Sequence, residues 1–82
     1  MTASNLASDL FREEGFTFTR QGSRMWAVTT LESWTAEGET WKHTGDIISH
    51  KNGWGAIYEN VTYIGFGSYI EAAKFLEIKR YS

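Results

Sequence analysis

The 82-residue sequence contains no cysteine and no proline. Without cysteine there can be no disulfide, no thiolate nucleophile and no zinc–thiolate site, which excludes thiol catalysis and redox switching. Basic residues are also few, since eight Lys and Arg stand against ten Asp and Glu and the net charge is −2. Partners rich in phosphate and anionic membrane surfaces usually select a basic excess. The composition therefore argues against nucleic acid and membranes as partners.

Long apolar runs and cofactor motifs are missing as well. No stretch approaches the roughly 18 apolar residues that span a bilayer, and the opening Met1–Asn5 places no basic residue before an apolar run. We therefore expect a soluble, cytoplasmic protein.

The glycine-rich stretches Gly53–Gly55 and Gly65–Gly67 lack the spacing of a phosphate loop. The only histidines, His43 and His50, fall on opposite faces of an expected strand, so we expect neither a cofactor nor a shared metal.

Aromatic residues are what the chain has in quantity. Four Trp, four Tyr and five Phe make up 16% of the sequence, and each of these side chains can bury roughly 150–250 Å². A chain of this length has room for one hydrophobic core. We therefore treat residues 1–82 as a single small α+β domain.

Hydrophobic periodicity predicts a helix at the start of the chain. Within Ser4–Glu14, Leu6 and Leu10 recur at i, i+4, Ser4 suits the N-cap, and Gly15 suits the left-handed position after a helix. The period then changes to two in Phe16–Arg20, which predicts a strand.

A series of antiparallel strands is expected next. Asn52-Gly53 is the clearest turn signal, because this pair favours a type I′ hairpin turn. Between Leu31 and Glu39 the periodicity fades, which suggests a connection or a wide hairpin turn around Glu37-Gly38. The expected strands after the first are Met25–Thr30, Thr40–Ser49 and Trp54–Tyr58, with Asn60–Phe66 either a fifth strand or an extension of the fourth.

The second helix has the best local signals. Ser68 followed by Glu71 is the pattern of a capping box, and it predicts a helix over Tyr69–Arg80. Both predicted helices are amphipathic, so we expect a two-layer α+β fold in which an antiparallel sheet of four to five strands is flanked by an N-terminal and a C-terminal helix, in the order α-β-β-β-β-α.

This order of elements resembles the layout of double-stranded-RNA-binding domains. Those domains grip phosphates with a lysine-rich cluster at the start of their last helix. The matching stretch here, Gly67-Ser68-Tyr69-Ile70-Glu71, has no basic residue and one acidic residue, so the resemblance concerns layout alone.

Aromatic residues are the candidate binding residues, because interface anchors are enriched in tryptophan and tyrosine. We select Trp34, Trp41, Trp54 and Tyr58, each of which could instead pack in the core. Trp34 lies in a polar stretch, and packing against the core is the more common fate of such a residue.

From these features we expect a non-catalytic protein-interaction module whose partner is another protein or, in a homodimer, a second copy. A phage or mobile-element accessory or inhibitor protein that binds a host protein sterically is one form of this hypothesis. The alternatives are a nucleic-acid-binding domain, whose affinity would fall with salt, and a small-ligand-binding protein or small enzyme, which would need a pocket of converging polar groups.

Overall fold

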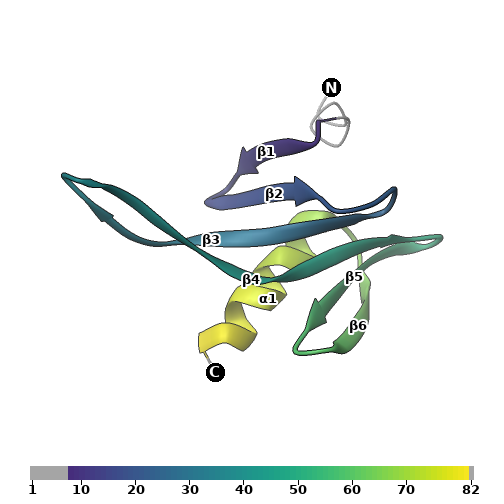
Figure 1. The fold of residues 1–82 in the computed structure, drawn as a ribbon. Helices are drawn as coiled ribbons and strands as arrows, with labels where there is room; N and C mark the ends of the chain where they lie inside the picture. Colours follow the sequence, from purple (N-terminus) through teal and green to yellow (C-terminus); the bar gives the residue numbers. More distant parts are fainter. Residues whose placement is uncertain (1–7, 82) are drawn as a thin grey trace.

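In a computed structural model, which describes residues 8–81, six antiparallel strands form one sheet and a single helix packs on it (Figure 1). Each strand pairs with the next along the chain, so the sheet is an uninterrupted meander. The elements are β1 (Leu10–Glu13), β2 (Phe16–Arg20), β3 (Met25–Thr35), β4 (Gly38–His50), β5 (Gly53–Tyr58), β6 (Val61–Phe66) and α1 (Tyr69–Tyr81).

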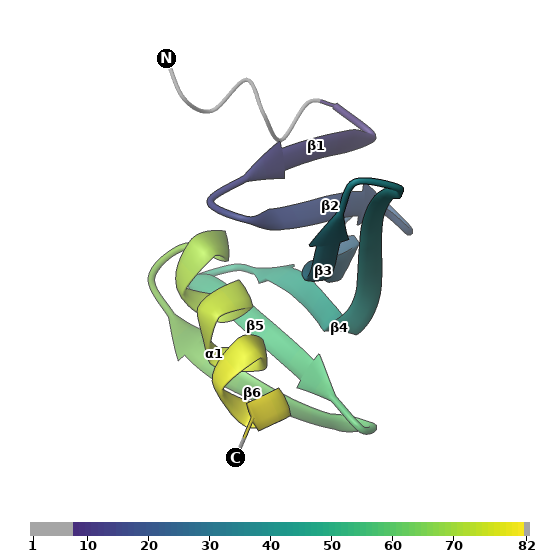
Figure 2. The ribbon, with the colours of Figure 1, turned by 90° about the vertical axis from the view of Figure 1, so that its left-hand side faces the viewer.

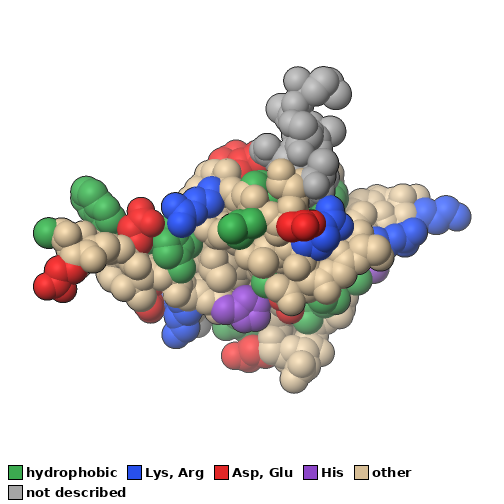
Figure 3. Space-filling view, turned by 45° about the horizontal axis from the view of Figure 1, so that its top comes forward, with side chains coloured by type: hydrophobic (Ala, Val, Ile, Leu, Met, Phe, Trp, Pro, Cys, Tyr) green, Lys and Arg blue, Asp and Glu red, His purple; other side chains and the backbone are tan. Residues whose placement is uncertain are grey.

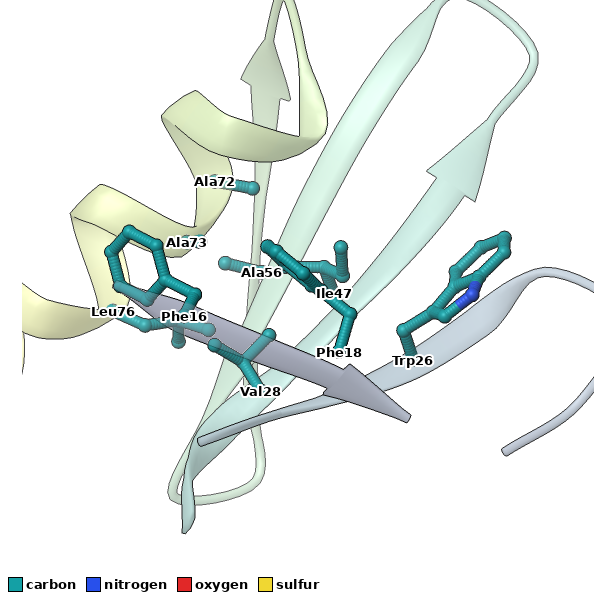
Figure 4. Packing of buried hydrophobic residues seen from close by; sticks show 9 residues of the cluster. All are labelled: Phe16, Phe18, Trp26, Val28, Ile47, Ala56, Ala72, Ala73 and Leu76. Atoms are coloured by element: carbon teal, nitrogen blue, oxygen red, sulfur yellow. The ribbon is translucent and has the colours of Figure 1, made fainter. Parts of the chain in front are cut away.

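The core lies between α1 and one face of this sheet. Alternate residues of β2 and β3 point toward the helix, as the two-residue period of a strand requires. The helix contributes two small residues and one large one, so it approaches β4, β5 and β6 closely. Figure 4 shows the buried cluster of Phe16, Phe18, Trp26, Val28, Ile47, Ala56, Ala72, Ala73 and Leu76. We call the opposite face of the sheet, which the helix does not cover, the outer face.

Close approach of helix and sheet depends on a glycine in β4. A Cβ atom on Gly45 would lie 2.7 Å from the Leu76 Cδ2 atom and 2.7 Å from the Ile57 carbonyl oxygen. A β-bulge lies at this point, because Val28 pairs with Gly45 while the next residue of β3 pairs with His43, leaving one extra residue in β4. The bulge and the glycine together bring the helix against the strand.

The predicted N-terminal helix is wrong. Residues 4–7 of that prediction lie outside the described residues, and Leu10–Glu13 form strand β1 instead. Phe11 stacks on Phe18 of β2 at 4.9 Å between ring centroids, and the Tyr69 hydroxyl donates a hydrogen bond of 2.5 Å to Glu13. These tertiary contacts outweigh a weak local helical pattern. Positive φ at Gly15 was correctly foreseen, but it serves the β1–β2 hairpin turn.

The sheet is larger than predicted, with six strands in place of four or five. Asn60–Phe66 supplies a separate strand, and the expected connection over Leu31–Glu39 is mostly strand, closed by a tight turn at Ala36–Glu37. The hairpin near Asn52 is confirmed, although its turn residues are Lys51 and Asn52.

Because α1 is the only helix in residues 8–81, the layout of a double-stranded-RNA-binding domain is not present. That helix is too short and too polar to cross a membrane.

The C-terminal helix is confirmed. The Glu71 amide donates to the Ser68 hydroxyl at 3.1 Å, which is the N-cap contact that the sequence predicts. The Glu71 carboxylate accepts from the Gly67 amide at 2.7 Å, one residue before the donor of a standard capping box. Ala72, Ala73 and Leu76 are buried, as expected for the apolar face.

Candidate interaction surface

A two-stranded arm projects from the sheet. Pairing between β2 and β3 ends at Thr30, and pairing between β4 and β5 begins only at Asp46. Between these points β3 and β4 pair only with each other, and a tight turn at Ala36–Glu37 connects them. We call residues 31–41 the arm; it extends away from the helix-covered body and points toward the viewer in the turned view (Figures 1 and 2). Residues 31–40 are all exposed, so neither face of the arm contributes to the core.

Apolar side chains share one face of this arm. Leu31 pairs with Trp41 and Trp34 pairs with Glu39, and the extra residue between these pairs keeps both on the same face. Trp34 is 76% exposed and Leu31 is 40% exposed, whereas Trp41 is half-buried. In the space-filling view, hydrophobic and acidic side chains lie next to each other on the projecting arm (Figure 3). The face continues the outer face of the sheet.

Trp41 is held in place by its neighbours. The Arg12 guanidinium of β1 lies 4.7 Å from the centroid of the indole ring, a cation–π contact. The indole Nε1 donates to Glu39 Oε1 at 3.2 Å, and the same carboxylate lies 3.6 Å from Arg12 Nη1. The three side chains therefore form a fixed cluster at the base of the arm, and Trp34 extends beyond it.

A chain of hydrogen bonds joins the base of the arm to the helix. Arg80 donates from Nη2 to Glu32 at 2.9 Å and from Nη1 to the Thr30 hydroxyl at 2.6 Å. The Thr30 and Thr44 hydroxyls lie 2.8 Å apart, and Thr44 in turn donates to the Lys42 carbonyl at 3.3 Å. A Thr44 hydroxyl that donates to this carbonyl accepts from Thr30, because a hydroxyl carries one proton. The chain of donors fixes the direction in which the arm leaves the sheet.

Trp54 and Tyr58, the other two predicted binding residues, belong to the helix side. The Trp54 ring lies 5.6 Å from the rings of both Trp26 and Tyr69, measured between centroids. Tyr58 is half-buried against the core cluster. The structure thus brings Trp34 and Trp41 together on the arm and places Trp54 and Tyr58 apart from them, in packing roles.

A polar cleft of about 500 Å³ lies between the middle of β4, the β5–β6 turn and the end of α1. His43 Nε2 lies 3.2 Å from Asp46 Oδ1 at this cleft, and the imidazole is more than half exposed. Arg80 also lines the cleft, but its guanidinium is already bound to Thr30 and Glu32. No group of three metal-ligating side chains occurs in residues 8–81. The cleft therefore offers one exposed His–Asp pair among groups of mixed charge.

Two residues that lie beside Trp41, Arg12 and Leu31, were not among the predicted binding residues. Arg12 was placed on the outside of a helix, and the four residues Leu10–Glu13 show no alternation of apolar and polar side chains that would have indicated a strand. Leu31 was assigned to a connection because its neighbours show no periodicity. Its place beside Trp41 depends on the register of β3 and β4, which the sequence does not encode locally.

Comparisons of the chain with protein-family models, with curated proteins and with solved structures gave no match.

Proposed function

We propose that this protein is a non-catalytic protein-interaction module that binds a partner protein through the apolar face of its arm. The observation that carries the proposal is Trp34, which is 76% exposed on a paired strand. No ring, cation or hydrogen-bond contact from another side chain within residues 8–81 engages the indole. Large apolar side chains lose free energy when left in water, and tryptophan is enriched among the residues that dominate binding interfaces.

The surroundings of Trp34 fit a protein partner. Leu31 and Trp41 extend the apolar surface, and Arg12 adds a third residue type that is common at interfaces. Glu37 at the tip of the arm contributes negative charge. Such a surface complements an apolar pocket with a basic rim and repels a phosphate backbone, so it supports a protein over a nucleic acid.

A module of this kind acts by occupying a surface of its partner. That mode of action suits an accessory or inhibitor protein of a phage or other mobile element, which blocks a host protein sterically. This extension rests on an analogy of composition. It is part of the same proposal and depends on the same arm.

The proposal is tested by Trp34→Ala with Ile78→Ala as the matched control. Ile78 is 66% exposed on the far side of the helix, so both substitutions remove an exposed apolar side chain. Each variant and the parent chain are immobilised, and proteins retained from nuclease-treated lysate of the source organism are identified by mass spectrometry. We expect Trp34→Ala to weaken partner binding about 30-fold, since truncation of an interface hot spot costs about 2 kcal/mol or more.

Stability measurements separate binding from folding. We expect Trp34→Ala to change the free energy of unfolding by less than about 0.5 kcal/mol, as for other exposed sites. Equal retention of the partner by the parent and by Trp34→Ala would refute the role of the arm. A large loss of stability on this substitution would show that Trp34 is a structural residue. Retention from untreated lysate that disappears after nuclease treatment would refute a protein partner.

A further inference from the structure

The two ends of the molecule carry opposite charge. The arm contains Glu32, Glu37 and Glu39 and no Lys or Arg. At the other end of β3 and β4 lie the turns at residues 21–24 and 51–52, which contain Arg24 and Lys51 and no acidic residue. These two turns are neighbours, because the Ser49 amide donates to the Arg24 carbonyl at 2.8 Å. We call them the basic end; Figure 3 shows its Lys and Arg side chains opposite the arm.

The charges at the extreme tips have no partner within the described part of the chain. Glu32 is paired with Arg80, and Glu39 with Arg12. Glu37, by contrast, forms no ion pair with any residue in 8–81, and the same holds for Arg24 and Lys51. The carboxylate without an ion pair on the arm is thus opposite in sign to the two cations without ion pairs at the basic end.

The basic end also contains a hollow for an apolar side chain. The hollow has a volume of about 310 Å³ and lies between the β4–β5 turn and β6. His50, Lys51, Trp54 and Ile64 line it, and Ile64 is 70% exposed. Its volume falls at the lower end of the range for binding pockets, about 300–1,000 Å³. One tryptophan side chain is the kind of group that such a small, partly apolar hollow can accept.

We propose that the partner of the arm is a second copy of this chain, bound head to tail. Trp34 of one copy lies in the hollow beside Ile64 of the next copy, and Glu37 lies against Lys51 and Arg24. This proposal rests on the proposed function, because it uses the same arm and names its partner. Charge complementarity between the two ends, together with an exposed indole at one and a hollow at the other, selects this occupant.

Head-to-tail contact has a consequence for assembly. The two surfaces differ, so each copy keeps one free arm and one free basic end after binding. Such a contact produces open chains or closed rings, whereas a symmetric dimer would need one self-complementary patch. The contact is small, so we expect association at micromolar to millimolar concentration that weakens as salt is added.

The experiment is sedimentation velocity of the full chain from micromolar to millimolar concentration, at low and high salt. The variants are Glu37→Lys, Lys51→Glu, the double variant and Trp34→Ala. We expect each single charge reversal to weaken association about tenfold. Glu59→Lys is the matched control, because Glu59 is an exposed turn residue that belongs to neither end, and it should leave association unchanged.

Rescue of the charge reversals is the decisive result. The double variant carries Lys on the arm and Glu at the basic end, so its association should return. An equimolar mixture of the two single variants should also co-assemble, and more strongly than either variant does alone. A general change in folding or solubility would not produce this pattern.

Several outcomes would overturn the assignment, and they identify different failures. A chain that stays monomeric at millimolar concentration but captures another protein through Trp34 refutes head-to-tail assembly and leaves the proposed function standing. A discrete dimer whose affinity neither charge reversal changes refutes the head-to-tail contact and indicates a symmetric interface in its place. Charge-dependent association that Trp34→Ala does not weaken removes the arm tryptophan from the contact and refutes the head-to-tail proposal, whereas the proposed function is refuted only by equal capture of a partner protein by the parent and by Trp34→Ala.

Discussion

Substitution of Gly45 by alanine tests how closely the helix lies on the sheet. The added methyl carbon would lie 2.7 Å from Leu76 Cδ2 and 2.7 Å from the Ile57 carbonyl oxygen. The leucine methyl can rotate away, but the carbonyl belongs to the backbone of the neighbouring strand and cannot move without disturbing the sheet. We therefore expect Gly45→Ala to lower the free energy of unfolding by about 1–3 kcal/mol, the usual cost of overpacking a core.

Urea unfolding followed by tryptophan fluorescence measures this loss as a lower midpoint at unchanged m-value. Gly22→Ala is the control, since its added carbon would meet no atom within 4 Å and Gly22 has no positive φ. Replacing glycine by alanine lowers the conformational entropy of the unfolded chain, so we expect Gly22→Ala to be neutral or to raise the free energy of unfolding by up to about 1 kcal/mol. A Gly45→Ala variant as stable as the control would refute the close packing of α1 on β4.

Two further substitutions test the elements that orient the arm and cap the helix. Arg80→Met removes the donors to Thr30 and Glu32, so we expect a loss of about 1.5–3 kcal/mol in urea unfolding and faster amide hydrogen exchange in the arm; exchange that rises equally throughout the chain would contradict a local role. Ser68→Ala removes the N-cap oxygen and should cost about 0.5–2 kcal/mol, measured in the same way, whereas Ser68→Asp should retain most of the stability. Equal loss in both Ser68 variants would contradict the capping contact.

Local signals were enough to predict α1 and most of the central strands. Ser68 acts on amides within its own first turn, so a cap of this kind can be recognised from a few neighbouring residues. The alternation in Phe16–Arg20 reflects one face buried under a helix and one face in solvent, and it too is visible in a short window. These elements were predictable because their causes lie close together in sequence.

The N-terminal segment and the arm were mispredicted for two different reasons. Leu10–Glu13 fits either a helical or a strand period over its four residues, and the choice is made by Phe18 and Tyr69, which are distant in sequence. In the arm, by contrast, neither face is buried, so no alternation is imposed on residues 31–40. A paired strand without a buried face cannot be told from a polar connection by periodicity.

The positions of the four candidate binding residues were not predictable from the sequence. Residue type was the basis for choosing all four, and the sequence could not say which face each would occupy. Trp54 packs toward Tyr69 because α1 covers that face of β5, whereas Trp34 lies beyond the last residue that β2 supports. The face on which each aromatic residue lies depends on the register of the six strands and on the length of the β3–β4 hairpin. Both are properties of the whole sheet.

The attachment of the arm bears directly on how it would bind. An isolated two-stranded hairpin is marginally stable in water, and a flexible arm would lose conformational entropy when it met a partner. Here Arg80 fixes Glu32 and Thr30 from the helix side, while Arg12 covers Trp41 from β1. Both ordering contacts act at the base and leave the indole of Trp34 exposed. In the proposed interaction the arm is thus oriented before binding, so less of the contact energy is lost to ordering, and a small surface centred on one tryptophan can suffice for specific recognition.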